Sequence, residues 1–167
     1  MLPPVRELST IVETKAIEAL KARYCRLLDT KDWAGFRELF TDDVSSDTVE
    51  SGGKVLEGAD EFVAFVKRSL SHAVTVHHVQ QPEFEVTSEV DARGVWAMQD
   101  LVRFGPGATM HGFGHYIETY EKHNGEWKIR SSKLTRLRME IQTPLVTVFV
   151  SPRVQRFIEW ATRRWVR

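Results

Sequence analysis

The chain has little cysteine and no excess of charge of either sign. Its single cysteine, Cys25, excludes a disulfide within the chain and leaves a cysteine-based zinc site without support. Lysine and arginine together number 23, as do aspartate and glutamate, so the formal net charge is zero. A broad electrostatic attraction to nucleic acid or to an anionic membrane is therefore not expected.

Long apolar runs are also absent. No stretch approaches the roughly 20 apolar residues of a membrane-spanning helix, so no membrane span is expected. Residues 1–10 contain two prolines and several charges but no apolar core, which argues against a secretory signal. These absences predict a cytoplasmic protein.

What is present is an ordinary globular composition. The 167 residues are 42% hydrophobic and 28% charged, which suits one domain with a sizeable core. No internal repeat or low-complexity tract divides the chain. We expect residues 1–167 to form a single domain, with 1–10 as an N-terminal arm and 141–167 as a C-terminal extension of strand and helix.

The first half of the chain has helical periodicity. Apolar residues three and four apart predict a helix over 11–29, with Tyr24 on its apolar stripe. Shorter helices are expected over 32–40 and 60–70. Between them, residues 45–56 predict a weak hairpin that turns at Gly52-Gly53.

The second half changes to strand patterns. Strands are expected over 74–79, 83–88, 94–104, 112–122, 126–140 and 141–150, followed by an amphipathic closing helix over 152–167. Asn124-Gly125 is a strong hairpin signal between two of them. Helices followed by a long antiparallel run predict an α+β fold, in which helices pack on one curved sheet. The concave side of such a sheet is a favourable place for a ligand.

Asp100 is the most unusual residue in these strands. Alternation puts it on one face with apolar residues, namely Trp96, Met98, Val102 and Phe104. A carboxylate in such surroundings is costly unless it is hydrogen-bonded, paired or used. The alternative is an aspartate at a strand end or facing solvent.

Tyr24 and Asp29 lie at the end of the first predicted helix. Tyr24 on an apolar stripe fits either a cavity or a core tyrosine with a satisfied hydroxyl. Asp29 opposes the helix dipole at a C-terminus, so it needs another reason to be there. The two residues are a little over one helical turn apart, and both reach the same cavity if the helix end points into it.

Two adjacent histidines, His77 and His78, must face opposite sides of a strand. Alternation counted back from Phe84 puts His78 inward. Pro82 intervenes, however, and prolines in sheets mark bulges or edges, so the count does not carry across it. A surface position for one or both histidines also stays open.

Further polar residues follow on the later strands. His111, Phe113 and His115 share one strand face, and Tyr116, Glu118 and Tyr120 share the other. His111 and His115 would be about 13 Å apart at strand rise, too far to chelate one metal ion easily. Arg136 belongs either to the pocket or to a solvated basic edge, as we expect for Arg138.

At this point the pattern resembles a known family. The stretch 23–33 is similar to the first-helix signature of SnoaL-like proteins, in the nuclear transport factor 2-like superfamily. More narrowly, it resembles bile acid 7α-dehydratase and scytalone dehydratase. The resemblance continues from His77 to Phe104, including Pro82-Glu83, and resumes over 120–136.

The resemblance implies a cone-shaped α+β barrel, in which N-terminal helices enclose a pocket. The implied pocket residues are Tyr24, Asp29, His77, Asp100 and Arg136. His77 is preferred to His78 here because of its five-residue distance to Pro82. Candidate substrate contacts are Trp96, Met98, Phe104 and Phe113, all of which would also suit a core, with His115 as a further candidate.

The implied activity is a dehydratase that needs no metal or cofactor. His77 would act as acid and base, oriented by Asp29, while Tyr24 would donate to a carbonyl. Asp100 would hold the leaving hydroxyl or share proton transfer, and Arg136 would bind an anionic group or fix Asp100.

The expected partner is a hydrophobic hydroxylated small molecule, such as a steroid or an aromatic polyketide. Relatives of this kind form dimers or trimers, so a homo-oligomer is expected. Two alternatives stay open: an isomerase or cyclase with Asp100 as the base, and a binding protein without activity.

Overall fold

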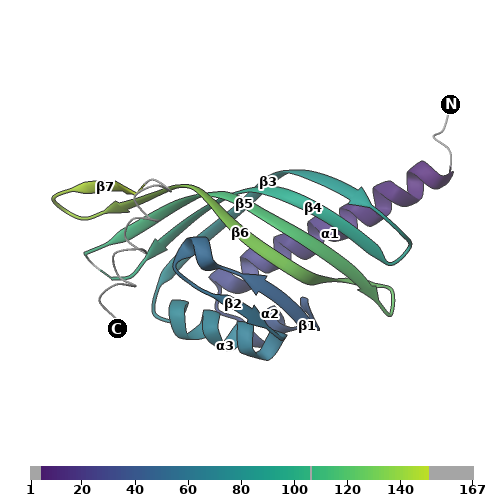
Figure 1. The fold of residues 1–167 in the computed structure, drawn as a ribbon, viewed down its shortest axis with the longest axis horizontal. Coiled ribbons are helices and arrows are strands. Elements are labelled where there is room, and N and C mark those ends of the chain that lie inside the picture. The colour runs from purple at the N-terminus through teal and green to yellow at the C-terminus, as the bar shows by residue number, and fades with distance from the viewer. Residues whose placement is uncertain (1–4, 106, 151–167) are drawn as a thin grey trace.

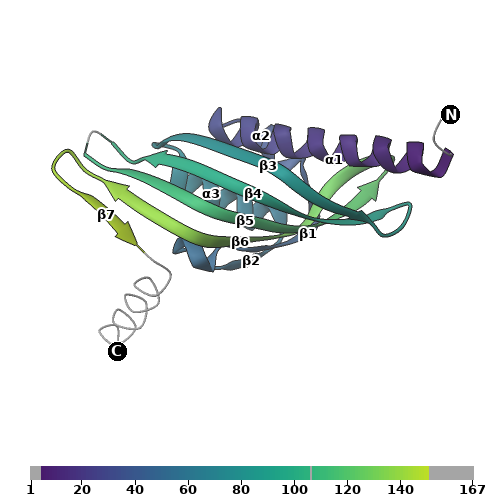
Figure 2. The ribbon, with the colours of Figure 1, turned by 90° about the horizontal axis from the view of Figure 1, so that it is seen from above.

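The computed structural model describes residues 5–105 and 107–150, and the predicted C-terminal helix over 152–167 lies outside them. The described chain is an α+β fold with three α-helices on one face of a curved, unclosed sheet (Figures 1 and 2). The fold class expected from the sequence is confirmed. Within the described residues, no helix is long and apolar enough to cross a membrane.

The helices are α1 (Val5–Asp29), α2 (Trp33–Arg37) and α3 (Ala59–Leu70). α1 begins six residues before its predicted start, so residues 5–10 belong to the helix and not to an arm. Its buried stripe has the expected spacing and consists of Ile17, Leu20, Lys21, Tyr24, Leu27 and Leu28. Beyond Asp29 the chain reverses at Lys31, which has a positive φ of 61°.

The sheet contains seven strands, and a short 3₁₀ helix, η1 (Val49–Ser51), joins the first two. The strands are β1 (Phe40–Asp47), β2 (Val55–Glu57), β3 (Val74–Val86), β4 (Asp91–Arg103), β5 (Thr109–His123), β6 (Glu126–Gln142) and β7 (Thr147–Val150). Their order is β2-β1-β6-β5-β4-β3, and β7 pairs with the far end of β6. The β1–β6 pair is parallel, whereas an antiparallel sheet was expected. A parallel neighbour is feasible because α3 and four strands separate β1 from β6 in the chain.

Both predicted hairpin turns form. Asn124 and Gly125 both have positive φ, 51° and 85°, and they join β5 to β6 as a tight two-residue turn. β1 and β2 pair over three residues each, and Gly52 takes the left-handed conformation in the loop between them. The predicted strand over 141–150 is instead broken at Thr143, whose backbone N–H donates to Val146.

Register shifts interrupt three of the ladders, among them the β1–β6 ladder between Phe40 and Ser45. The two strands predicted over 74–88 form one strand, β3, whose register shifts between Gln80 and Glu83. On β6 the register shifts at Arg130 and again at Leu137, where one extra residue enters each time. A bulge moves every following side chain to the other face, so these positions decide what points into the molecule.

The core fills the space between the helices and the concave face of the sheet. Its centre is a set of aromatic rings with centroids 5.0–6.2 Å apart, formed by Tyr24, Phe36, Phe40 and Phe62. α1 runs along the sheet beside β3, and α3 lies beside β1 and β2 (Figures 1 and 2). The core leaves a cavity against part of the concave face, and polar side chains converge on it.

Candidate functional site

A cavity of about 230 Å³ opens between α1, α3 and the concave face of the sheet. Its apolar lining consists of Leu28, Phe62, Phe65, Val66, Leu70, Val102, Phe104, Met110 and Leu134. Its principal polar lining consists of Tyr24, His77, Asp100, Tyr116, Ser132 and Arg136. A mostly apolar cavity with a few converging polar groups is the usual form of a small-molecule site.

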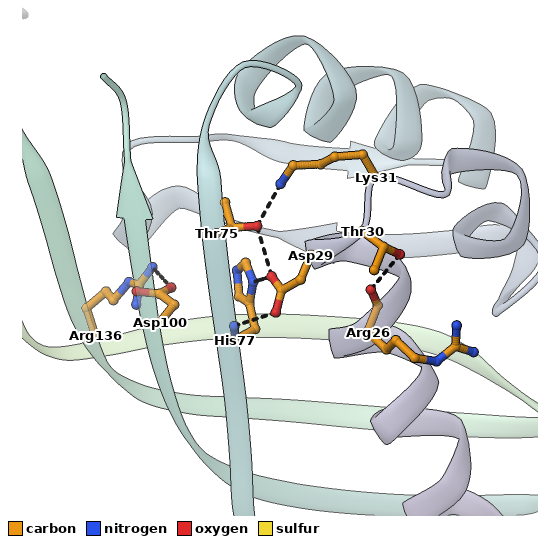
Figure 3. A network of polar contacts seen from close by, with 8 residues as sticks. All are labelled: Arg26, Asp29, Thr30, Lys31, Thr75, His77, Asp100 and Arg136. Atoms are coloured by element: carbon orange, nitrogen blue, oxygen red, sulfur yellow. Dashed lines mark hydrogen bonds and ion pairs between the residues drawn. The ribbon is translucent and has the colours of Figure 1, made fainter. Parts of the chain in front are cut away.

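An aspartate–histidine pair lies at one wall of this cavity (Figure 3). Asp29, the last residue of α1, places its Oδ1 2.7 Å from Nδ1 of His77 on β3. The same carboxylate accepts the backbone N–H of His77 at 2.8 Å and the hydroxyl of Thr75 at 2.9 Å. Asp29 does not itself line the cavity but lies behind the imidazole ring. These three hydrogen bonds stabilise the Asp29 carboxylate and offset its unfavourable position at the C-terminal end of a helix.

The charge of Asp29 determines the tautomer of His77. Burial alone would raise the pKa of Asp29, but hydrogen bonds from the ring and backbone of His77 and from Thr75 lower that pKa below its ordinary value. An ionised carboxylate has no proton to donate, so Nδ1 of His77 must carry the hydrogen of their shared bond. In the neutral ring, Nε2 is then an unprotonated acceptor.

The bulge in β3 decides which histidine faces the cavity. His77 is buried and His78 is exposed. Alternation counted back from Phe84 favours His78. This count is wrong because two residues of β3, Gln81 and Pro82, stand opposite the single residue Trp96 of β4 at the bulge. His77 is consequently the cross-strand neighbour of Asp100, and both side chains line the cavity.

Asp100 and Arg136 form a second pair, across two strands. Arg136 on β6 donates from Nη2 to Oδ2 of Asp100 on β4 at 2.6 Å, and both side chains are less than 5% exposed. β5 runs between them, and the residue at the crossing is Gly112. Any Cβ at that position would collide with the guanidinium and with Oδ1 of Asp100. Because Gly112 has no side chain, the Asp100 carboxylate and the Arg136 guanidinium can meet across β5.

The other two nitrogen atoms of the Arg136 guanidinium also have partners. Nε donates to the Ser51 hydroxyl at 2.8 Å, and Nη1 lies 3.5 Å from the sulfur of Met98. The backbone N–H of Arg136 donates to Glu50 at 2.8 Å, so η1 is attached to this strand at two points. In contrast, Oδ1 of Asp100 is buried and has no hydrogen-bond partner among the described residues. A buried acceptor of this kind is costly, and it marks a place where a donor from a ligand or solvent is needed.

Tyr24 and Tyr116 make up another part of the wall. Their ring centroids are 5.8 Å apart, and Nζ of Lys21 lies over both rings, at 3.9 and 3.7 Å from the centroids. Burial raises the pKa of Tyr24 well above its ordinary value, and the negative charge of Glu118 acts in the same direction. Burial likewise raises the pKa of Tyr116. Both hydroxyls therefore stay protonated, as donors rather than bases.

A second buried ion pair lies beneath the tyrosines. Nζ of Lys21 is 2.6 Å from Oε1 of Glu118, and neither side chain is exposed. Glu118 also accepts from Ser132 at 2.9 Å and from the Tyr120 hydroxyl at 2.7 Å. Trp96 donates to that same Tyr120 hydroxyl at 2.7 Å. Trp96 was a candidate substrate contact, but it does not line this cavity and belongs to the core network.

Of the other candidate contacts, only Phe104 lines the cavity. Met98 is buried next to the Arg136 guanidinium. Phe113 and His115 lie on the opposite face of β5, because Gly112, Gly114 and Tyr116 occupy the inward positions. Their prediction as cavity residues is wrong, since alternation on this strand turns them away from the cavity. Arg138 is half-exposed and pairs with Glu140, as expected for a basic edge.

Several residues of the site were not predicted from the sequence, among them Tyr116 and Gly112. Tyr116 was recognised as sharing a face with Glu118, but not as a cavity residue. Gly112 and Gly114 alternate within a strand pattern, and glycine inside a strand often marks a close approach of other groups, which was the available signal. Among residues 5–105 and 107–150, no group of three or more His, Cys, Asp or Glu is arranged to share a metal ion.

Comparisons with known proteins agree with this fold. A sequence model of the SnoaL-like domain matches residues 9–133. A relative from Gibberella zeae, named probable cyclase FGR4, is 25% identical over 137 residues, which are 72% of this chain and 89% of the relative.

Two solved structures share the fold. A protein from Novosphingobium aromaticivorans, provisionally named a scytalone dehydratase, has a TM-score of 0.72 at 21% identity and covers 78% of this chain and 87% of its own. Hexachlorocyclohexane dehydrochlorinase LinA-type3 from Novosphingobium barchaimii has a TM-score of 0.66 at 15% identity and covers 86% and 94%. With the cavity enclosed by α1, α3 and the curved sheet, and with the domain match over 9–133, the chain belongs to the SnoaL-like family.

Proposed function

We propose that this protein is a hydro-lyase that removes water from a hydrophobic hydroxylated substrate by acid–base catalysis. The observation that carries the proposal is the Asp29–His77 pair, which leaves Nε2 of His77 as an acceptor on the side of the cavity. Histidine titrates near neutrality, so it both accepts and returns a proton under physiological conditions. Asp29 orients the ring and stabilises the imidazolium that forms.

The proposed reaction balances without an oxidant or a reductant. Nε2 of His77 takes a proton from a carbon next to a substrate carbonyl, and the C–H electrons move into an enolate. The carbon–oxygen bond of the neighbouring hydroxyl then breaks, a carbon–carbon double bond forms, and the departing oxygen takes the proton back from His77. One water molecule leaves, and the histidine returns to its starting state.

The other cavity residues stabilise the enolate and position the hydroxyl group that leaves. The protonated hydroxyls of Tyr24 and Tyr116 donate to the carbonyl oxygen, where negative charge develops in the enolate. Oδ1 of Asp100, which has no partner among residues 5–105 and 107–150, accepts from the substrate hydroxyl and holds it close to His77. Arg136 keeps Asp100 in place through their 2.6 Å ion pair.

A second candidate is an isomerase or cyclase acting in the same cavity. The relative named probable cyclase favours it, since proton removal next to a carbonyl also begins such reactions. The two candidates differ in product mass, because an isomerase or cyclase conserves the substrate's atoms whereas a hydro-lyase product is lighter by one water.

The test begins with a thermal-shift screen of hydroxylated steroids and aromatic polyketides, followed by mass spectrometry of incubations with the hits. We expect a product that has lost one water. His77→Ala should lower its rate of formation about 10²–10⁴-fold, the usual contribution of a general acid–base group. His78→Ala is the matched control, because its exposed side chain points away from the cavity. Unchanged turnover in both His77→Ala and Asp29→Asn would refute the assignment.

A further inference from the structure

The cavity contains one strongly basic side chain, and that side chain is already paired. Among the described residues that line it, Arg136 is the only lysine or arginine, whereas Asp47 and Asp100 are both acidic. Asp47 pairs with Lys133 at 3.3 Å on the far side of the wall. The charged side chains that line the cavity therefore carry no net positive charge.

Arg136 is also unsuited to bind an anion by its geometry. Its Nη2 and Nε donate to Asp100 and Ser51 at 2.6 and 2.8 Å, and its Nη1 lies against the Met98 sulfur. A carboxylate or phosphate would have to displace Asp100 from this fork to obtain two parallel hydrogen bonds. The displaced carboxylate, 3% exposed, would then lie unpaired beside a second negative charge.

The unsatisfied atoms in the cavity favour an uncharged partner. Oδ1 of Asp100 needs a hydrogen-bond donor, and a hydroxyl group supplies one without bringing charge. The hydroxyls of Tyr24 and Tyr116, held protonated by burial, offer donors to a carbonyl oxygen. The remaining wall is largely apolar.

We infer that the reacting end of the ligand is uncharged, with a hydroxyl directed at Asp100 and a carbonyl oxygen directed at the two tyrosines, and that carboxylates and phosphates are excluded from this cavity. This rests on the proposed function, since it names the substrate class of the same site. It also assigns Arg136 a positioning role toward Asp100 rather than a role in binding an anionic substrate group.

The experiment compares two fluorescent two-ring probes of nearly equal shape, an acetylnaphthol and the hydroxynaphthoate of the same substitution pattern. Each is titrated into the full chain at neutral pH, where the naphthoate is ionised and the acetylnaphthol is uncharged. We expect the acetylnaphthol to bind at least tenfold more tightly. Equal or tighter binding of the naphthoate would overturn the inference, as would failure of the acetylnaphthol to bind.

Two variants test the cause of the preference. Asp100→Asn leaves the Arg136 guanidinium without its carboxylate, so it should bind the naphthoate at least tenfold more tightly than the original chain does. Asp47→Asn is the matched control, because it removes one negative charge from the same wall while the Asp100–Arg136 pair stays intact. An equal gain in both variants would overturn the specific role of the pair.

Arg136→Gln covers the case in which Asp100→Asn fails to fold, as judged by circular dichroism. Because Arg136 positions Asp100, Arg136→Gln should weaken binding of the acetylnaphthol at least as much as binding of the naphthoate, and selective loss of naphthoate binding would contradict the inference. His77→Ala separates this result from the proposed function. If it keeps the probe preference but the original chain dehydrates no substrate, the proposed function fails alone. If His77→Ala abolishes dehydration but the original chain lacks the preference, this inference fails alone.

Discussion

Two buried ion pairs lie on the concave face of the same sheet, and they differ in whether their polar atoms are satisfied. Both oxygens of Glu118 accept hydrogen bonds, from Lys21 and Ser132 on one side and from Tyr120 on the other. In the Asp100–Arg136 pair, one oxygen of Asp100 has no partner in the part of the chain that the structure describes. Both pairs are almost completely removed from solvent.

The difference separates a structural network from a site. A buried polar network in which every member is satisfied adds rigidity and leaves nothing for a ligand to bind. A buried carboxylate with one free oxygen on a cavity wall is incomplete until a donor arrives. We therefore expect changes at Glu118 to act on stability, and changes around Asp100 to act on ligand binding and turnover.

The largest expected effect is on stability at the satisfied pair. Glu118→Gln leaves the Lys21 ammonium buried without a counter-charge, which should lower the free energy of unfolding by about 3–5 kcal/mol. Urea denaturation measures this loss. Adding Lys21→Met to Glu118→Gln should restore part of the lost stability, because the unpaired charge is removed. A loss of unfolding free energy below about 1 kcal/mol in Glu118→Gln would show that the Lys21–Glu118 pair contributes little to the stability of the fold.

A smaller effect is expected where the unsatisfied pair crosses β5. Gly112→Ala puts a methyl group into the space occupied by the Arg136 guanidinium and Asp100, so the two must separate. Overpacking of this kind costs about 1–3 kcal/mol of stability, and we expect turnover to fall as well because Asp100 moves. Gly107→Ala is the matched control, since a Cβ there meets no atom within 4 Å. Equal effects of the two substitutions on stability and turnover would show that the Asp100–Arg136 pair does not depend on a glycine at position 112.

The two tyrosines should show a still smaller effect, confined to the reaction. Tyr116→Phe removes one of two donors to the developing oxyanion while keeping the ring against Lys21, so turnover should fall about tenfold, the equivalent of one hydrogen bond. Tyr24→Phe should behave similarly, and steady-state kinetics on a substrate from the screen measures both. A change in unfolding free energy that exceeds the change in activation free energy would place these hydroxyls with the structural network instead.

The smallest effect concerns the third pair, Asp29 and His77, in acid. Because the folded state holds the pKa of Asp29 below its ordinary value of 3.8, the folded chain releases this proton more readily than the unfolded chain. The resulting stabilisation is present above that value and is lost as the pH falls through the lowered pKa. Melting temperatures measured from neutral pH into acid should therefore fall less steeply for Asp29→Asn than for the original chain. Parallel curves would show that the hydrogen bonds to Asp29 do not favour its charged form.

Much of the fold follows from local patterns. The apolar stripe of α1, the positive-φ turn at Asn124-Gly125 and the alternation along β4 each involve neighbours in sequence, and each forms as predicted. The start of α1 and the division of β3 into two strands were predicted incorrectly. The parallel pairing of β1 with β6 was not anticipated, because it depends on which strands meet after the chain has folded.

The same distinction between local patterns and long-range strand pairing applies to the residues of the site. Helical and strand periods are local, so the sequence predicts that Tyr24 lies on a buried helical face and that Asp100 faces inward with Trp96 and Met98. The positions of His77 and Arg136 on the cavity wall depend instead on how the strands pair. Alternation from Phe84 pointed to His78, and alternation from Ile129 would turn Arg136 outward. The bulges at Gln80–Glu83 and at Arg130 reverse both counts, because a bulge is set by the register of the neighbouring strand.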